Sequence, residues 1–91
     1  MQTRKPVVAG QFYPASSQAC IDEIQEYLHQ NPKPQSLPEN IVAGIVPHAG
    51  WAFSGALALM VLSAIKQQNG SVDTFVIFGA AHSYYGSRPA V

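Results

Sequence analysis

Two apolar runs of strand length flank a helix-like segment, and this order constrains the fold more than any other feature of the sequence. The first run covers residues 41–46 and the second covers residues 72–79. Short apolar runs bounded by turn residues are typical of strands buried on both faces of a parallel sheet. A crossover helix makes two such strands parallel, so their carboxyl ends meet at the same sheet edge. The pattern therefore predicts an α/β unit.

A first helix is predicted before these strands. Ser16 or Ser17 can cap it, and the proline-rich stretch 31–34 ends it. Its apolar positions recur at helical spacing and fall on one face, which predicts an amphipathic helix at the surface. These positions are Cys20, Ile24, Tyr27 and Leu28.

The segment between the two apolar runs predicts a second helix over residues 55–68. Ser54 is its candidate cap, and Asn69-Gly70 is a pair that ends helices readily. The segment is apolar nearly all round, so we expect a helix that is buried on most sides.

Composition limits the classes of protein that fit. Five basic and five acidic residues give a formal net charge of zero, which argues against a nucleic-acid binder. Only 11% of the 91 residues are charged and 47% are hydrophobic, whereas a small free-standing domain needs a largely polar surface. Two parallel strands also cannot complete a sheet. We therefore expect residues 1–91 to be the N-terminal part of a single larger α/β domain.

Membrane and secreted classes are also disfavoured. Residues 41–65 carry no charged side chain, but Pro47 and His48 interrupt them, and a spanning helix would leave these groups unsatisfied in lipid. The first residues lack the apolar core of a signal peptide, and the single Cys20 excludes an intrachain disulfide framework. We expect a cytoplasmic protein with no membrane partner.

One histidine follows each predicted strand, at His48 and His82. Either can be a structural turn residue, but ligands of open α/β sheets bind at the carboxyl ends of strands, where both are placed. Neutral imidazole suits iron, copper, zinc and nickel. The third ligand is expected beyond residue 91, because Asp73 begins its strand at the opposite edge and Cys20 and His29 belong to the first helix. Four aromatic residues are candidates for a pocket wall beside the histidines or for ordinary packing: Trp51, Phe53, Tyr84 and Tyr85.

Three ordered motifs resemble the Memo-like family, also called AmmeMemoRadiSam system protein B. They are Arg-x-Pro-x-Val-Ala-Gly-x-Phe-Tyr-Pro at 4–14, Pro-His-Ala-Gly-Trp-x-Phe-Ser-Gly at 47–55 and Phe-Gly-x-x-His at 78–82. The resemblance implies a three-layer α/β domain with a mostly parallel central sheet, similar to class III extradiol dioxygenases. It also implies a functional association with a radical-SAM enzyme and an Ammecr-domain protein.

The same resemblance implies a metal pocket whose ligands are His48, His82 and a cysteine from the C-terminal part, which Cys20 does not match. It places Trp51, Phe12 and Tyr13 at the pocket. We expect a divalent metal, iron first and copper or zinc as alternatives, with oxygen or redox chemistry on a small molecule or peptide. The alternatives are a non-catalytic binding or scaffold protein that uses the same pocket, and a structural metal. Trp51 stands where the family often has tyrosine, and His82 is followed by Ser83-Tyr84-Tyr85-Gly86, where many members have a second histidine.

Overall fold

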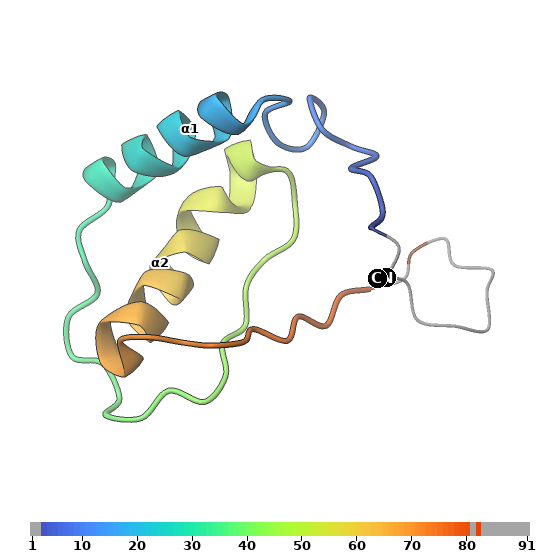
Figure 1. Ribbon diagram of the computed structural model, residues 1–91. Helices are drawn as coiled ribbons and strands as arrows, with labels where there is room; N and C mark the ends of the chain where they lie inside the picture. Colours follow the sequence, from blue (N-terminus) through green and yellow to red (C-terminus); the bar gives the residue numbers. More distant parts are fainter. Residues whose placement is uncertain (1–2, 81, 83–91) are drawn as a thin grey trace.

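The computed structural model describes residues 3–80 and 82, and over these residues two helices form the regular structure (Figure 1). Helix α1 covers Ser17–Gln30 and helix α2 covers Trp51–Asn69. The two helices pack against each other, with Tyr27 of α1 meeting Gly55 near the beginning of α2. The loop 31–50 connects them and returns the chain to the first turn of α2 (Figure 1).

Helix α1 forms where its sequence predicts it. The Ser16 hydroxyl accepts a hydrogen bond of 3.1 Å from the backbone N–H of Ala19, which is the bond expected of an N-cap. The helix ends at Gln30, and the backbone N–H of Asn31 still donates to the carbonyl of Tyr27. The predicted cap and the predicted end before Pro32 are both confirmed.

Helix α2 begins at Trp51 rather than at Gly55, and its N-cap is Gly50. The prediction that Ser54 caps this helix is wrong. Ser54 lies inside the first turn and is only 5% exposed, and its hydroxyl donates to the carbonyl of Ala49 over 2.9 Å. The other end is confirmed, since Gly70 closes the helix with φ of 66°, a conformation that favours glycine.

The described residues do not bury this second helix on most sides, and its burial within a larger domain stays a prediction. Within α2 only Ser54, Gly55 and Ala64 are buried, and Phe53 and Leu57 are 86% and 57% exposed. Helix α1 covers one side of α2 near its beginning. Most of the remaining apolar surface has no cover among residues 3–80 and 82.

The two predicted strands are not formed within the described part of the chain. Segments 41–46 and 72–79 have no strand hydrogen bonding, and the β-bridge between Ala9 and Tyr13 is an isolated one. Val42, Ile45 and Phe78 are more than nine-tenths exposed. A strand bonds only to a neighbouring strand. Over residues 3–80 and 82 the two segments therefore have no strand pairing, and the parallel strand pair and the three-layer sheet stay predictions.

Segment 41–46 nevertheless lies against α2 at one point. A Cβ atom placed on Gly44 would lie 2.5 Å from Cγ1 of Val61 and 3.4 Å from Cδ1 of Ile65. The backbone can approach the helix this closely only because residue 44 has no side chain. Side-chain amides of Gln68 and Asn69 donate to carbonyls of the preceding loop, at Pro38 and Ile41. These contacts fix the path that leads to His48.

Candidate functional site

A tight loop over residues 8–13 provides one side of the candidate site. The N–H groups of Gln11 and Phe12 donate to the carbonyl of Val8, and the N–H of Gly10 donates to the carbonyl of Tyr13 over 2.7 Å. Gly10 has φ of 83°, which side-chain-bearing residues rarely adopt. Glycine at this position therefore permits the loop, which presents Phe12 and Tyr13 side by side.

This loop is joined to the turn that carries His48. The backbone N–H of Trp51, which begins α2, donates to the carbonyl of Phe12 over 2.8 Å. The rings of Tyr13 and Trp51 have centroids 5.9 Å apart with planes inclined at 37°, a spacing typical of aromatic pairs. The structure thus brings together Phe12, Tyr13 and Trp51, the three residues predicted to line the pocket.

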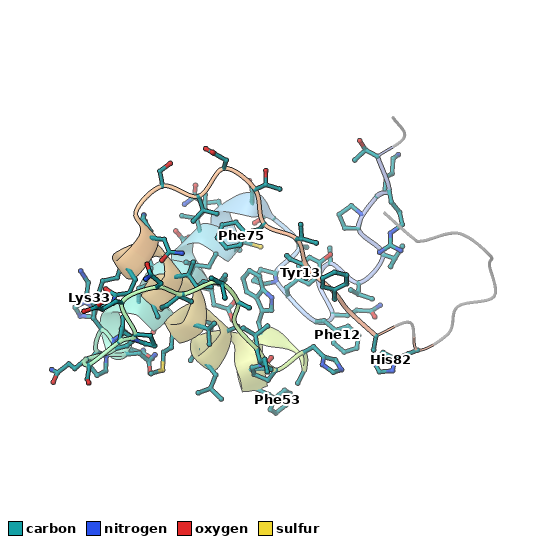
Figure 2. All side chains as sticks on the ribbon, turned by 90° about the horizontal axis from the view of Figure 1, so that it is seen from below. Phe12, Tyr13, Lys33, Phe53, Phe75 and His82 are labelled. Atoms are coloured by element: carbon teal, nitrogen blue, oxygen red, sulfur yellow. The ribbon has the colours of Figure 1, made fainter. Side chains whose placement is uncertain are left out.

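His48 and His82 also come together. Their ring centroids lie 5.5 Å apart, with the planes inclined at 34°. Both side chains are exposed, and each lies past the end of one of the two extended segments. Figure 2 shows His82 at the end of the segment that leaves α2, on the same side of the molecule as Phe12. The convergence expected of the two histidines is therefore present without a formed sheet.

The spacing of the two rings fits a shared metal ion. Two imidazoles whose nitrogens lie ~2.0–2.1 Å from one ion have centroids about 5 Å apart when they bind at a tetrahedral angle. The observed 5.5 Å is close to that value. Two exposed imidazoles on loops are also a donor pair that suits iron, copper and zinc.

The residues described do not supply a third ligand. Over residues 3–80 and 82, no group of three or more histidine, cysteine, aspartate or glutamate side chains is placed to hold a metal. Cys20 is on α1, where its thiol donates to the carbonyl of Pro14. Asp73 follows the end of α2 while His48 precedes its beginning, and the 19 residues between these ends span about 28 Å.

Phe53 does not join the aromatic group. It is 86% exposed, and Figure 2 shows its ring away from His82 at the lower edge of the molecule. The other predicted wall residues, Tyr84 and Tyr85, lie outside the described residues, as does Ser83.

Tyr27 and Ser54 form hydrogen bonds to the backbone beside His48, and the sequence did not predict these roles. The Tyr27 hydroxyl lies 2.6 Å from the Glu23 carboxylate and 3.2 Å from the carbonyl of Trp51, and it can donate to either. The bond to Glu23, followed by burial and nearby negative charge, raises the pKa of Tyr27 above its ordinary value. Ser54 holds the carbonyl of Ala49. Helical spacing identified Tyr27 as an apolar-face residue, but its polar role depends on where α2 packs.

Comparison with known proteins places the chain in a family. The Memo-like protein family matches residues 4–91. A MEMO1 family protein of Methanococcoides burtonii is 38% identical over 88 residues, which cover 97% of this chain and 31% of the relative. A MEMO1 family protein of Pyrococcus abyssi is 41% identical over 88 residues, with 97% and 29% covered. This chain belongs to the Memo-like family.

The relatives are much longer than the sequence. A third MEMO1 family protein, from Pyrobaculum arsenaticum, is 38% identical over 96 residues, and the match covers all of this chain but 34% of the relative. The chain thus spans about a third of the length of the curated relatives it matches. No solved structure gives a significant match. None of the helices in the described part of the chain is both long and apolar enough to cross a membrane.

Proposed function

We propose that the full-length protein binds a divalent metal ion through His48 and His82, and that iron is the metal it holds, with copper or zinc as alternatives. The observation that carries this proposal is the 5.5 Å separation of the two exposed rings. A third protein ligand comes from outside the described residues. The proposal includes the three-layer α/β domain, in which segments 41–46 and 72–79 become neighbouring strands.

The chain's own residues hold the turn that carries His48. His48 lies in the turn just before Trp51, and two hydrogen bonds hold Trp51 in place. Its backbone N–H donates to the carbonyl of Phe12, and its carbonyl lies within reach of the Tyr27 hydroxyl. This support matters because metal sites need ligands that are already oriented before the ion binds. The aromatic rings of Tyr13 and Trp51 form an apolar wall beside the turn. A bound metal with free coordination positions would supply Lewis-acid or redox chemistry there.

Two functions use such a site. In the first, the protein is an enzyme that performs oxygen or redox chemistry on a small molecule. In the second, the protein binds a peptide or small molecule at the same place without turnover. The exposed position of both rings favours a site that a ligand can reach over a structural metal, whose coordination is closed. Oxygen-dependent formation of a product by the metal-loaded protein separates the enzyme from the binding protein.

The metal proposal is tested by measuring metal content per chain in the full-length protein. His48→Ala and His82→Ala should each abolish stoichiometric binding. His29→Ala, in the last turn of α1, is the matched control and should keep full occupancy. Both site histidines are exposed, so truncation opens little core cavity and the melting temperature should change little. Full metal occupancy in the His48 and His82 variants would overturn the proposal, and unfolding of these variants would favour a structural metal.

A further inference from the structure

We propose that the groove between the end of α1, the loop 31–34 and α2 binds a small molecule with an apolar body and one carboxylate. The cavity has a volume of about 420 Å³. Pockets that hold small ligands measure roughly 300–1,000 Å³. The proposed site is separate from the histidine pair, since Figure 2 shows Lys33 and His82 at opposite ends of the molecule.

The walls of the groove are mainly apolar. Leu28 belongs to α1, and Leu59 and Met60 come from the facing side of α2. Pro32 and Pro34 close one side, and each proline ring fixes a backbone dihedral angle, so this wall is stiff. The flexible thioether of Met60 can adapt to the shape of a ligand. Such a lining favours an aliphatic or aromatic body.

The charged groups of the groove all have one sign. Lys33 from the loop and Lys66 from α2 both line it, and no acidic or arginine side chain does so among the described residues. Both lysines are exposed, so their ammonium groups stay solvated at the edge of the groove. Ser63 and Gln67 add neutral hydrogen-bonding groups at the same wall of α2. The groove is therefore complementary to a single anionic group.

Lysine pairs with carboxylate and with phosphate groups, and the apolar share of the lining favours the singly charged carboxylate over a doubly charged phosphate ester. Lysine presents a compact point charge, and most of the remaining surface of this groove is apolar. An apolar acid matches both parts: its carboxylate meets Lys33 and Lys66, and its body meets Leu59 and Met60.

The experiment is calorimetric titration of the full-length protein with 4-phenylbutyrate and, as the uncharged control, 4-phenylbutyramide. We expect the amide to bind about two- to fivefold more weakly, because an ion pair to a solvent-exposed lysine contributes a factor of that size. The double variant Lys33→Gln/Lys66→Gln should lose affinity for the acid by a similar factor and bind acid and amide alike. Lys5→Gln, in the N-terminal segment, is the matched control and should bind like the parent.

Absence of measurable binding of the acid would overturn the proposal. Equal affinity for acid and amide would also overturn it, and so would a double variant that binds the acid as tightly as the parent. Because glutamine keeps most of the lysine stem and both positions are exposed, the variants should keep the parent's melting temperature. His48→Ala should leave binding of the acid unchanged, which separates this groove from the proposed metal site.

Discussion

The two helices are formed within the described residues, whereas the two extended segments, 41–46 and 72–79, have no strand hydrogen bonding. Helices α1 and α2 are fully formed, with a serine cap on α1 and a glycine end on α2. Segments 41–46 and 72–79 are also strongly apolar, but neither makes the backbone hydrogen bonds of a strand. Val42 and Phe78 are almost fully exposed. A helix closes its hydrogen bonds within itself, whereas a strand needs a neighbour.

The difference shows which part of the site depends on residues outside the described chain. The loop 8–13, the turn before α2 and Tyr27 are held by contacts within residues 3–80 and 82. The extended segments carry the histidines but are fixed at few points, of which Gly44 against Val61 is the closest. The aromatic wall is therefore a local structure, whereas in the proposed α/β domain the exact placement of the histidine pair would depend on strand pairing.

The largest expected effect concerns hydrogen exchange in the two extended segments. In the isolated 91-residue chain, their backbone amides should exchange almost as fast as in an unfolded chain. In the full-length protein they should slow by about three orders of magnitude or more, because core strands open with free energies near the global value of ~5 kcal/mol or above. The measurement is exchange followed by mass spectrometry of peptides that cover 41–46 and 72–79.

The helix pair supplies the internal reference for that measurement. Amides of α1 and α2 should already show some protection in the isolated chain, since their hydrogen bonds form there. Strong protection of the extended segments in the isolated chain would show that it folds as a complete domain. A sharp, cooperative, high-temperature melting of the isolated monomer would contradict the comparison in the same way.

The second prediction tests the point where the two regions touch. Gly44→Ala should destabilise the full-length protein by about 1–3 kcal/mol, because the added methyl group overlaps Val61. Shortening Val61 to alanine should relieve the overlap. The double variant Gly44→Ala/Val61→Ala should therefore lose less unfolding free energy than the two single variants lose together. Denaturant unfolding of all four proteins measures this coupling. Simple additivity would mean that segment 41–46 does not approach α2 at Gly44.

A smaller effect is expected at Tyr27. Tyr27→Phe removes the hydroxyl near Glu23 and Trp51 and should cost about 1 kcal/mol of unfolding free energy. Tyr13→Phe keeps the ring that faces Trp51 and is the matched control, with a smaller expected cost. Thermal melting of both variants in the full-length protein checks this order. A larger loss from Tyr13→Phe would mean that the Tyr27 hydroxyl does not support the turn.

The smallest expected effect is a loss of stability at alkaline pH. The pKa of Tyr27 is raised, chiefly by its hydrogen bond to Glu23, so the folded protein holds the phenolic proton more tightly than the unfolded chain. The resulting stabilisation is complete below the unfolded value of about 10 and is lost as the pH rises through the folded pKa. Unfolding free energy should therefore fall more steeply above about pH 10 in the parent than in Tyr27→Phe. Equal slopes would contradict the shift.

Local signals were sufficient to predict the helices and insufficient for the sheet. Ser16, Asn31 and Gly70 act through neighbours a few residues away, and they fix helix ends as expected. The beginning of α2 was misplaced because Gly50 serves as the cap, while Ser54 uses its hydroxyl to hold Ala49. Serine can make either kind of backbone bond, and only the position of the helix start distinguishes them.

The candidate site was also predicted only in part, because some of its contacts depend on how the helices pack. The order of strand, helix and strand predicted that His48 and His82 converge, and their rings do lie together. The wall of Phe12, Tyr13 and Trp51 followed from family resemblance, and these residues are also adjacent. Tyr27 and the groove beside Lys33 depend on how α1 packs on α2, which no local pattern contains.

The central claim is that His48 and His82 bind one and the same metal ion. X-ray absorption spectroscopy of the metal-loaded full-length protein tests it most directly, because the method counts imidazole ligands per metal. We expect one metal per chain with two imidazoles, and the loss of one imidazole from any metal that His48→Ala or His82→Ala still retains. An unchanged imidazole count in either variant, or two separate metals with one imidazole each, would contradict it.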